Sequence, residues 1–358
     1  MNDRPTGVGS LLRPALIAVT AVVVVGGAVL GARWMAGWVD RLGGPEAPAV
    51  PPGQPVEVEV PTGASAQQIG DLLTEVGVVS SRSDFEAATR EAGASQALKA
   101  GTYQLTTGMQ PEAVVAVLVE GPVIETYWIT VPEGLRTEEI LGRVAAQSHM
   151  TIGELAGALS SGDVASALRG PDAADDLASW EGLLFPDTYQ MARNWSAAEV
   201  LEVLVLTMEQ NFSQVDWANT RADSLTPYER LIVASLVESE TRLDRDRPLV
   251  ATVILNRLDA GMPLQIDATV LYALGVRGRS PTPSELEIDS LYNTYIYPGL
   301  PPTPISAPGA ASLAAVAAAV EADYLYFVLT GSDGSHSFTS DYEEFLRWKE
   351  EAQEQGLF

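Results

Sequence analysis

The stretch from Tyr228 to Gly275 constrains this chain most, because it sets a carboxylate into an aliphatic helix face. If residues 231–241 form a helix that turns by about 100° per residue, its apolar side chains gather on one broad arc. The arc consists of Ile232, Val233, Leu236 and Val237. Glu240 falls near the centre of this arc, whereas Glu238 points the opposite way. The pattern therefore predicts that Glu240 alone packs inward.

Glu240 has a functional and a structural interpretation, and the pattern alone weighs them about equally. An inward glutamate loses solvation, so its pKa rises and it stays protonated near neutral pH as a general acid. Alternatively, it turns outward at the helix end and pairs with Arg242 or Arg245. Residues two apart on a helix do not face each other, so Glu238 and Glu240 are not the paired acid and nucleophile of a retaining glycosidase.

Composition excludes several function classes. The formal net charge is −26, from 47 acidic and 21 basic residues, and such a surface repels phosphate backbones. We therefore expect no nucleic-acid partner. The absence of cysteine excludes disulfides, thiolate metal sites and cysteine nucleophiles. His149 and His336 are the only histidines, which leaves little for a transition-metal site, so we expect no cofactor.

An uncharged run from Ala15 to Ala32 is the one candidate membrane segment. Its 18 residues are at the lower limit for spanning a bilayer, and Trp34 and Trp38 follow at interface depth. We predict a retained anchor over residues 15–35, rather than a cleaved signal peptide, after a tail of residues 1–14. Arginines are nearly balanced on the two sides, so charge does not set the orientation.

Beyond the anchor, composition predicts a linker and two domains. Residues 36–55 are rich in proline and glycine and form the predicted linker. Residues 56–122 alternate valine with glutamate at their start and then carry helical patterns and a strand, which indicates a small α+β module. Residues 123–358 form the predicted larger domain of mixed helices and strands.

Several motifs occur together in this larger domain and at its border. They are ASLVESET, LVATVILNRL, GMPLQIDATVLYALG, LYNTYIYPGLPP, ISAPGAASLAAV and GSHSF. In this order they resemble the membrane-anchored endolytic murein transglycosylases, the YceG-like family, from about Val56 to the C-terminus. The resemblance implies an α+β fold class: a single transmembrane helix, a LysM-like module and a mixed α/β catalytic domain. It also implies that the second glutamate of E-x-E-T, Glu240, is the catalytic residue on a helix.

The resemblance further implies an activity and a place in the cell. Such an enzyme cuts peptidoglycan strands internally, between N-acetylmuramic acid and N-acetylglucosamine, leaves 1,6-anhydro ends and terminates glycan elongation. It implies a single-pass protein of the cytoplasmic membrane with an extracytoplasmic catalytic domain, whose partners are glycan strands and the membrane. An association with peptidoglycan synthases stays open. Two rivals are a hydrolytic glycosidase, which in its inverting form would need a second carboxylate such as Asp267 or Asp187, and a non-catalytic wall-binding scaffold.

The resemblance also indicates residues that line the substrate cleft. They are Gln265, Asp267, Tyr292, Asn293, Thr294, Tyr295, Glu181, Asp187 and His336. Most have a structural alternative. Asp267 is better explained as the N-cap of a helix over residues 268–274, the tyrosines as core residues, and His336 as a solvated loop residue. The EGLLFPDTY segment, with Glu181 and Asp187, is alternatively a turn that caps the next element. For the LysM-like module we favour packing and spacing over sugar binding, because no cluster of exposed aromatic residues marks a sugar platform.

Overall fold

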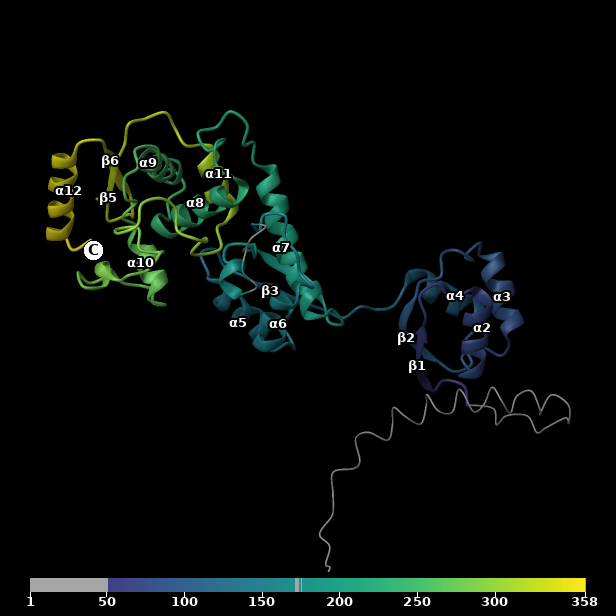
Figure 1. Ribbon diagram of the computed structural model, residues 1–358. Coiled ribbons are helices and arrows are strands. Elements are labelled where there is room, and N and C mark those ends of the chain that lie inside the picture. Colours follow the sequence, from purple (N-terminus) through teal and green to yellow (C-terminus); the bar gives the residue numbers. More distant parts are fainter. Residues whose placement is uncertain (1–50, 171–173, 175, 358) are drawn as a thin grey trace, which may run out of the picture. The chain divides into compact units, whose positions relative to one another are not determined.

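The computed structural model describes residues 51–170, 174 and 176–357 (Figure 1). The chain divides into two compact units, with the boundary between Val123 and Ile124. The predicted anchor at residues 15–35 and most of the predicted linker lie outside the described residues. None of the helices in the described part of the chain combines the length and the apolar content needed to cross a bilayer.

The first unit is a two-stranded sheet with three helices on one side of it (Figure 1). Strand β1 (Pro55–Val60) pairs antiparallel with β2 (Gly101–Thr106). The helices are α2 (Ala66–Glu75), α3 (Arg82–Glu91) and α4 (Pro111–Glu120). Val58 and Val60 are buried beneath the helices while the alternating glutamates face outward, as the alternation predicts. Ser65 begins α2 with a capping box. The unit is therefore α+β, and its likeness to a LysM module stays a prediction.

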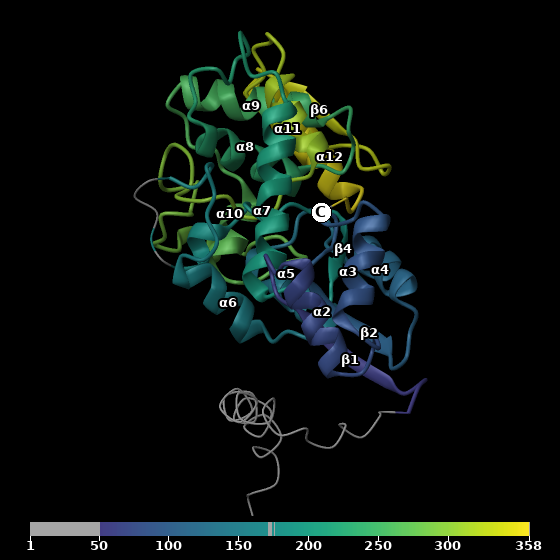
Figure 2. The ribbon, with the colours of Figure 1, turned by 90° about the vertical axis from the view of Figure 1, so that its right-hand side faces the viewer.

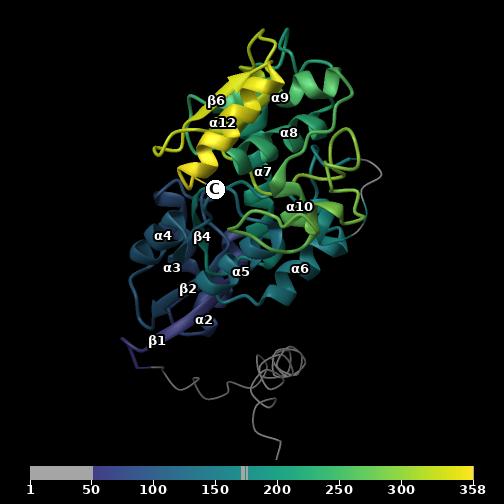
Figure 3. The same cartoon turned by 90° about the vertical axis from the view of Figure 1, so that its left-hand side faces the viewer.

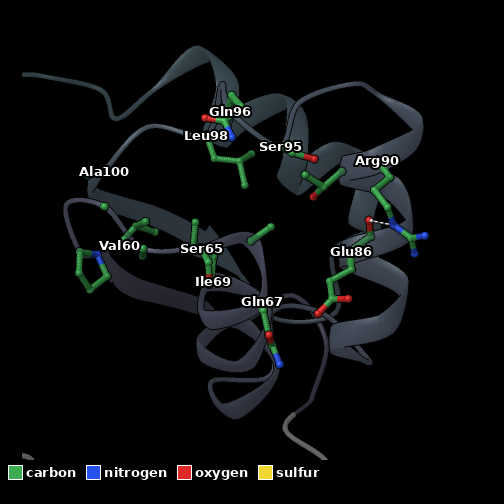
Figure 4. A pocket seen from close by; sticks show the side chains of 15 residues that line it. Val60, Ser65, Gln67, Ile69, Glu86, Arg90, Ser95, Gln96, Leu98 and Ala100 are labelled. Carbon is green, nitrogen blue, oxygen red and sulfur yellow. Dashed lines mark hydrogen bonds between the residues drawn. The ribbon is translucent and has the colours of Figure 1, made fainter.

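The first unit also holds an open cavity of about 600 Å³ between α2, α3 and the loop before β2 (Figure 4). Its one acidic lining residue, Glu86, lies 3.5 Å from Arg82 on the same helix. No aromatic side chain lines it. The cavity thus offers neither an isolated acid nor a stacking surface for a ring.

The second unit is mainly helical and carries two antiparallel strand pairs. The pairs are β3 (Thr126–Thr130) with β4 (Thr188–Ala192), and β5 (Tyr326–Leu329) with β6 (His336–Thr339). The helices are α5 (Thr137–Gln147), α6 (Ile152–Ser161), α7 (Ala197–Gln214), α8 (Pro227–Glu240), α9 (Arg247–Asp259), α10 (Asp267–Ala273), α11 (Ala310–Ala317) and α12 (Tyr342–Glu354), with 3-10 turns at Leu177–Trp180 and Glu285–Glu287. The α+β class is confirmed, and every strand pair in the described residues is antiparallel.

Helix α8 lies at the centre of this unit and packs against α9, α10 and α11 (Figures 1 and 2). Seven consecutive residues, 231–237, are buried, so this helix is surrounded and not merely amphipathic. Helix α12 covers the β5–β6 pair, with Phe345 stacked on Tyr326 at 5.2 Å between ring centroids (Figure 3). The buried centre of the unit therefore surrounds the helix that ends at Glu240.

The β3–β4 pair joins segments that are about sixty residues apart. Thr130 lies opposite Thr188, and the Val131 amide donates to the Asp187 carbonyl. This pairing brings the Glu181 segment against the start of α5. Within the intervening region, Thr151 forms a capping box with Glu154 that starts α6.

Candidate active site

Helix α8 positions Glu240 at its last residue. The helix begins at a capping box in which Thr226 Oγ1 accepts from the Glu229 amide and Glu229 accepts from the Thr226 amide. Pro227 follows at the first helical position, where its missing N–H costs nothing. The helix stops because Thr241 is extended. The buried body of α8 thus fixes the acid at the point where the helix opens onto a cavity.

This cavity has a volume of about 530 Å³ and is built from four segments of the second unit. They contribute Glu133, Gly134 and Arg136; residues 238–242; Asp267, Ala268 and Leu271; and residues 276–280, with Ile305 in addition. Its size is within the usual range for small-ligand pockets. The wall combines four acidic residues with four arginines, so it is charged and not a mere packing defect.

Glu240 is enclosed by protein, yet part of its side chain reaches the cavity. Burial and, to a smaller extent, the negative charge of Asp267 raise the pKa of Glu240, Arg257 lowers it, and the net result is a pKa of about 7. Within the described residues, its carboxyl group makes no hydrogen bond or ion pair, so neither Arg242 nor Arg245 pairs with it. A carboxyl group in this state can both give and take a proton near neutral pH.

Asp267 lies beside Glu240, but not in the role of a helix cap. Ile266 is the N-cap of α10 and makes no side-chain cap hydrogen bond. The predicted capping role is therefore wrong. The reason is a contact distant in sequence: the Tyr295 hydroxyl donates to Asp267 Oδ1 at 2.5 Å, which turns the carboxylate away from the helix amides. The hydrogen bond from Tyr295 thus fixes the Asp267 carboxylate in the cavity wall.

Arg257 supplies the opposing positive charge from behind the wall. Its side chain is buried, and its Nε donates to the Leu325 carbonyl at 2.7 Å, while Nη1 donates to the Leu264 carbonyl at 2.7 Å. Backbone carbonyls therefore accept from the guanidinium, and no carboxylate in the described part of the chain forms an ion pair with it. Its charge lowers the pKa of Glu240 without forming a bond to it.

Glu238 is buried, whereas the helical pattern predicted that it points away from the buried face. Its side chain is only 8% exposed, and it accepts from Arg247 Nη1 at 3.2 Å, from the Gly309 amide at 3.1 Å and from Ser312 Oγ at 2.8 Å. The expectation that Glu240 alone packs inward is therefore wrong. A wheel for one helix assumes one buried face, whereas α9 and α11 cover a second side of α8. Glu238 joins these three helices.

Glu181 is a second buried acid, and it does not line the cavity. It is 4% exposed and accepts from the Thr137 amide at 2.9 Å and from the Tyr272 hydroxyl at 3.1 Å. Burial raises its pKa to about 7, although these hydrogen bonds and Arg136 lower it. Arg136 lies over the Tyr272 ring at 4.9 Å from its centroid. Glu181 thus lies outside the cavity wall, and Tyr272 connects it to the wall residue Arg136.

The loop residues Asn293 and Thr294 are buried, and their side chains form hydrogen bonds with the backbone of neighbouring segments. Asn293 Nδ2 donates to the carbonyls of Leu286 and Ile288, each at 2.9 Å. Thr294 Oγ1 accepts from the Ile266 amide at 3.0 Å. The structure therefore does not bring these two side chains to the cavity. They instead hold the segment that leads into Asp267.

The other predicted binding residues are scattered around the site. Tyr292 packs on Tyr272 at 4.9 Å between ring centroids. Asp187 is exposed at the start of β4, where it accepts from the next amide. Gln265 is exposed, with a left-handed backbone at φ 53°. None of these three is part of the 530 Å³ cavity wall.

His336 is neither solvated nor on a loop, contrary to its structural interpretation. It lies on β6 with its side chain 9% exposed, and Nδ1 is 3.2 Å from Asp246 Oδ2. The same carboxylate oxygen accepts from the His336 amide at 2.8 Å. His336 therefore ties β6 to the start of α9, away from the 530 Å³ cavity.

The sequence reasoning missed the arginines of the cavity wall. Arg277 and Arg279 lie on the Val276–Ser280 loop, and Arg136 donates to the Val276 carbonyl at 2.8 Å. The missed signal is VRGRS directly after a recognised motif, in a chain where basic residues are scarce. In the described residues, no group of three or more His, Cys, Asp or Glu side chains could hold a metal ion.

Comparisons with known proteins agree with this arrangement. The endolytic murein transglycosylase of Bacillus subtilis (strain 168) is 31% identical over 304 residues, covering 82% of this chain and 84% of that protein. The protein of the same name from Streptococcus pneumoniae (serotype 2, strain D39) is 29% identical over 327 residues, and the match covers 57% of its length. The solved structure of a putative YceG-like protein from Listeria monocytogenes has a TM-score of 0.54 at 28% identity, covering 82% of this chain and 99% of that one.

The sequence model of the YceG-like family matches residues 58–351, which is most of the chain and includes every residue of the 530 Å³ cavity wall. This protein is a member of the YceG-like family.

Proposed function

We propose that this protein is an endolytic murein transglycosylase, which cleaves peptidoglycan strands internally between N-acetylmuramic acid and N-acetylglucosamine. One observation carries the proposal: a glutamic acid whose pKa is raised to about 7 opens onto a 530 Å³ cavity without a hydrogen-bond partner among the described residues. Relatives in two genera bear this enzyme's name.

The reaction needs one carboxyl group because the substrate supplies its own nucleophile. Glu240 gives its proton to the glycosidic oxygen as the bond from that oxygen to the muramic C1 breaks. The muramic C6 hydroxyl then forms the new bond to C1, and Glu240 takes the hydroxyl proton. The acid is restored, no water is consumed, and the product ends in a 1,6-anhydro ring. A pKa near 7 suits both steps, because the acid and base forms are both accessible at neutral pH.

Asp267 and Arg257 adjust this acid from two sides. The negative charge of Asp267, held by the Tyr295 hydroxyl, favours the protonated form of Glu240. Arg257 favours the ionised form. A glutamate subject to both effects keeps its pKa near the working pH instead of shifting to an extreme.

Product analysis tests the proposal directly. Wild-type protein acting on purified glycan strands should release internal fragments whose muramic ends are lighter by one water than hydrolytic ends and resist borohydride reduction. Mass spectrometry before and after reduction reads both properties. Reducing ends would instead indicate hydrolysis, with Asp267 as the base. Binding of strands without any cleavage would favour a wall-binding scaffold.

The membrane arrangement belongs to the same proposal. Residues 15–35 anchor the protein, residues 36–55 form the linker, and residues 56–122 form a LysM-like spacer before the catalytic domain at 123–358. The catalytic domain then lies outside the cytoplasmic membrane. A C-terminal reporter should be active only on the outer side and stay membrane-bound. A soluble, processed protein beginning near Trp34 would contradict the anchor.

A further inference from the structure

The cavity around Glu240 is unusual in its charge. Over the whole chain, acidic residues outnumber basic ones by 47 to 21. On the cavity wall the numbers are equal: Glu133, Glu238, Glu240 and Asp267 against Arg136, Arg242, Arg277 and Arg279. A chain with so few basic side chains thus places four of them around one cavity. Such local enrichment is typical of a site for an anionic group.

Two of these arginines are already neutralised by carboxylates outside the wall. Arg279 forms a two-pronged pair with Glu285, at 2.6 and 2.7 Å. Arg277 lies 3.1 Å from Glu139 and donates to the Gly134 carbonyl. These contacts hold the Val276–Ser280 loop in place, and they leave little charge for a ligand.

The other two arginines keep their positive charge. Among the described residues, Arg136 forms no ion pair and donates to the carbonyls of Leu271 and Val276, at 3.2 and 2.8 Å, although the charges of Glu139 and Glu181 act on it from a distance. Arg242 is exposed and has no hydrogen bond or ion pair with any residue that the structure describes. It follows Glu240 by two positions, directly after the extended Thr241. Arg242 and Glu240 therefore line the same cavity.

We propose that Arg242, on the cavity wall that also holds Arg136, binds a carboxylate of the stem peptide carried by the muramic residue that is cleaved. This inference rests on the proposed function. The stem peptide is attached to the same sugar ring as the reacting C1, so it begins within one sugar ring of the bond that lies at Glu240. A charged group at the end of the glycan strand lies far from the cavity when the strand is cut internally. The enzyme therefore favours strands that bear charged peptides.

Matched substrates and variants test this subsite. Strands with intact stem peptides are compared with the same strands after their carboxylates are converted to methylamides. Wild-type kcat/KM should fall about five- to tenfold on the neutral strands, mainly through KM. Arg242→Ala should show a similar fall on charged strands and almost none on neutral ones, and Arg242→Lys should recover part of it. The wild-type preference should weaken as salt is raised.

Arg143 provides the control. It is exposed on α5, also without a partner among the described side chains, and it does not line the cavity. Arg143→Ala should behave as wild type on both substrates. Equal losses for Arg242→Ala on charged and neutral strands would overturn the inference, and so would no loss on either.

A binding measurement keeps this inference separate from the proposed function. If wild-type protein forms no anhydro product on any strand, the proposed function fails. The subsite is then decided by the affinity of Glu240→Gln for the two strands, with and without Arg242→Ala. Tighter binding of charged strands that depends on Arg242 supports the subsite, and equal binding refutes it.

Discussion

Two glutamates in the second unit share a pKa raised to about 7 and lie in opposite surroundings. Glu181 is 4% exposed and accepts hydrogen bonds from an amide and a tyrosine hydroxyl. Glu240 makes no such bond within the described residues and reaches a cavity. Burial is the main cause of the raised pKa in both residues, but its consequences differ. A raised pKa indicates burial, but only access to a substrate makes a buried acid a catalytic candidate.

The largest expected effect separates these two acids by activity. Glu240→Gln keeps the shape of the side chain but cannot protonate a leaving oxygen, so turnover should fall by ~10²–10⁴-fold with strand binding retained. Glu181→Gln should stay within a few-fold of wild type, because Glu181 does not reach the cavity. Both rates come from anhydro-product release. Full activity of Glu240→Gln would refute the assignment.

A third buried acid, Glu238, should affect the stability of the fold. Glu238 and Arg247 form a buried ion pair with side chains 8% and 7% exposed. Glu238→Gln removes the buried counter-charge of that arginine and leaves it only the exposed Asp244, at 3.2 Å. The loss should cost up to about 3–5 kcal/mol of the free energy of unfolding. Denaturant titration measures this cost. A variant as stable as wild type would mean that the three-helix contact contributes little.

The pH dependence of stability tests the two raised pKa values together. A carboxyl group whose folded pKa exceeds its unfolded value contributes stability below about pH 4.5, and that contribution is lost as pH rises through about 7. Each group should therefore cost on the order of 3 kcal/mol between pH 4.5 and 8. Denaturant titrations at several pH values measure the loss. Glu240→Gln and Glu181→Gln should each remove part of it, and parallel pH curves for variants and wild type would contradict the raised values.

The smallest expected effect concerns the neighbour of the catalytic acid. Asp267→Asn removes a negative charge beside Glu240 and leaves an oxygen that can still accept from Tyr295. The pKa of Glu240 should fall, so the alkaline limb of the kcat/KM profile should move to lower pH. Glu181→Gln provides a matched control, whose profile should not move. Loss of all turnover in folded Asp267→Asn would instead assign this carboxylate a direct role in the reaction.

Sequence patterns predicted the parts of this site that depend on local rules. Helix α8 and the inward place of Glu240 on it follow from periodicity. The wrong predictions depended on distant partners. Glu238 is buried by α9 and α11, and Asp267 is turned by Tyr295, which no single-helix pattern contains.

The sequence patterns did not predict the arginines of the cavity wall, for the same reason. Arg136 meets the Val276 carbonyl across 140 positions of sequence. Local spacing contains no information about such a contact, because the fold alone determines which loops meet. The predicted anchor is a different case, since it lies outside the described residues.

The left-handed backbone at Gln265 has a consequence for how this site can change over evolutionary time. A glycine would adopt φ 53° without the steric cost, on the order of 1 kcal/mol or more, that a side chain incurs there. Selection for stability alone should therefore favour glycine at this position. A glutamine is expected here only if its side chain gives another selective advantage. The side chain is exposed two residues before Asp267, so contact with substrate is the simplest advantage. Replacing it with glycine should make the protein more stable and a poorer binder of glycan.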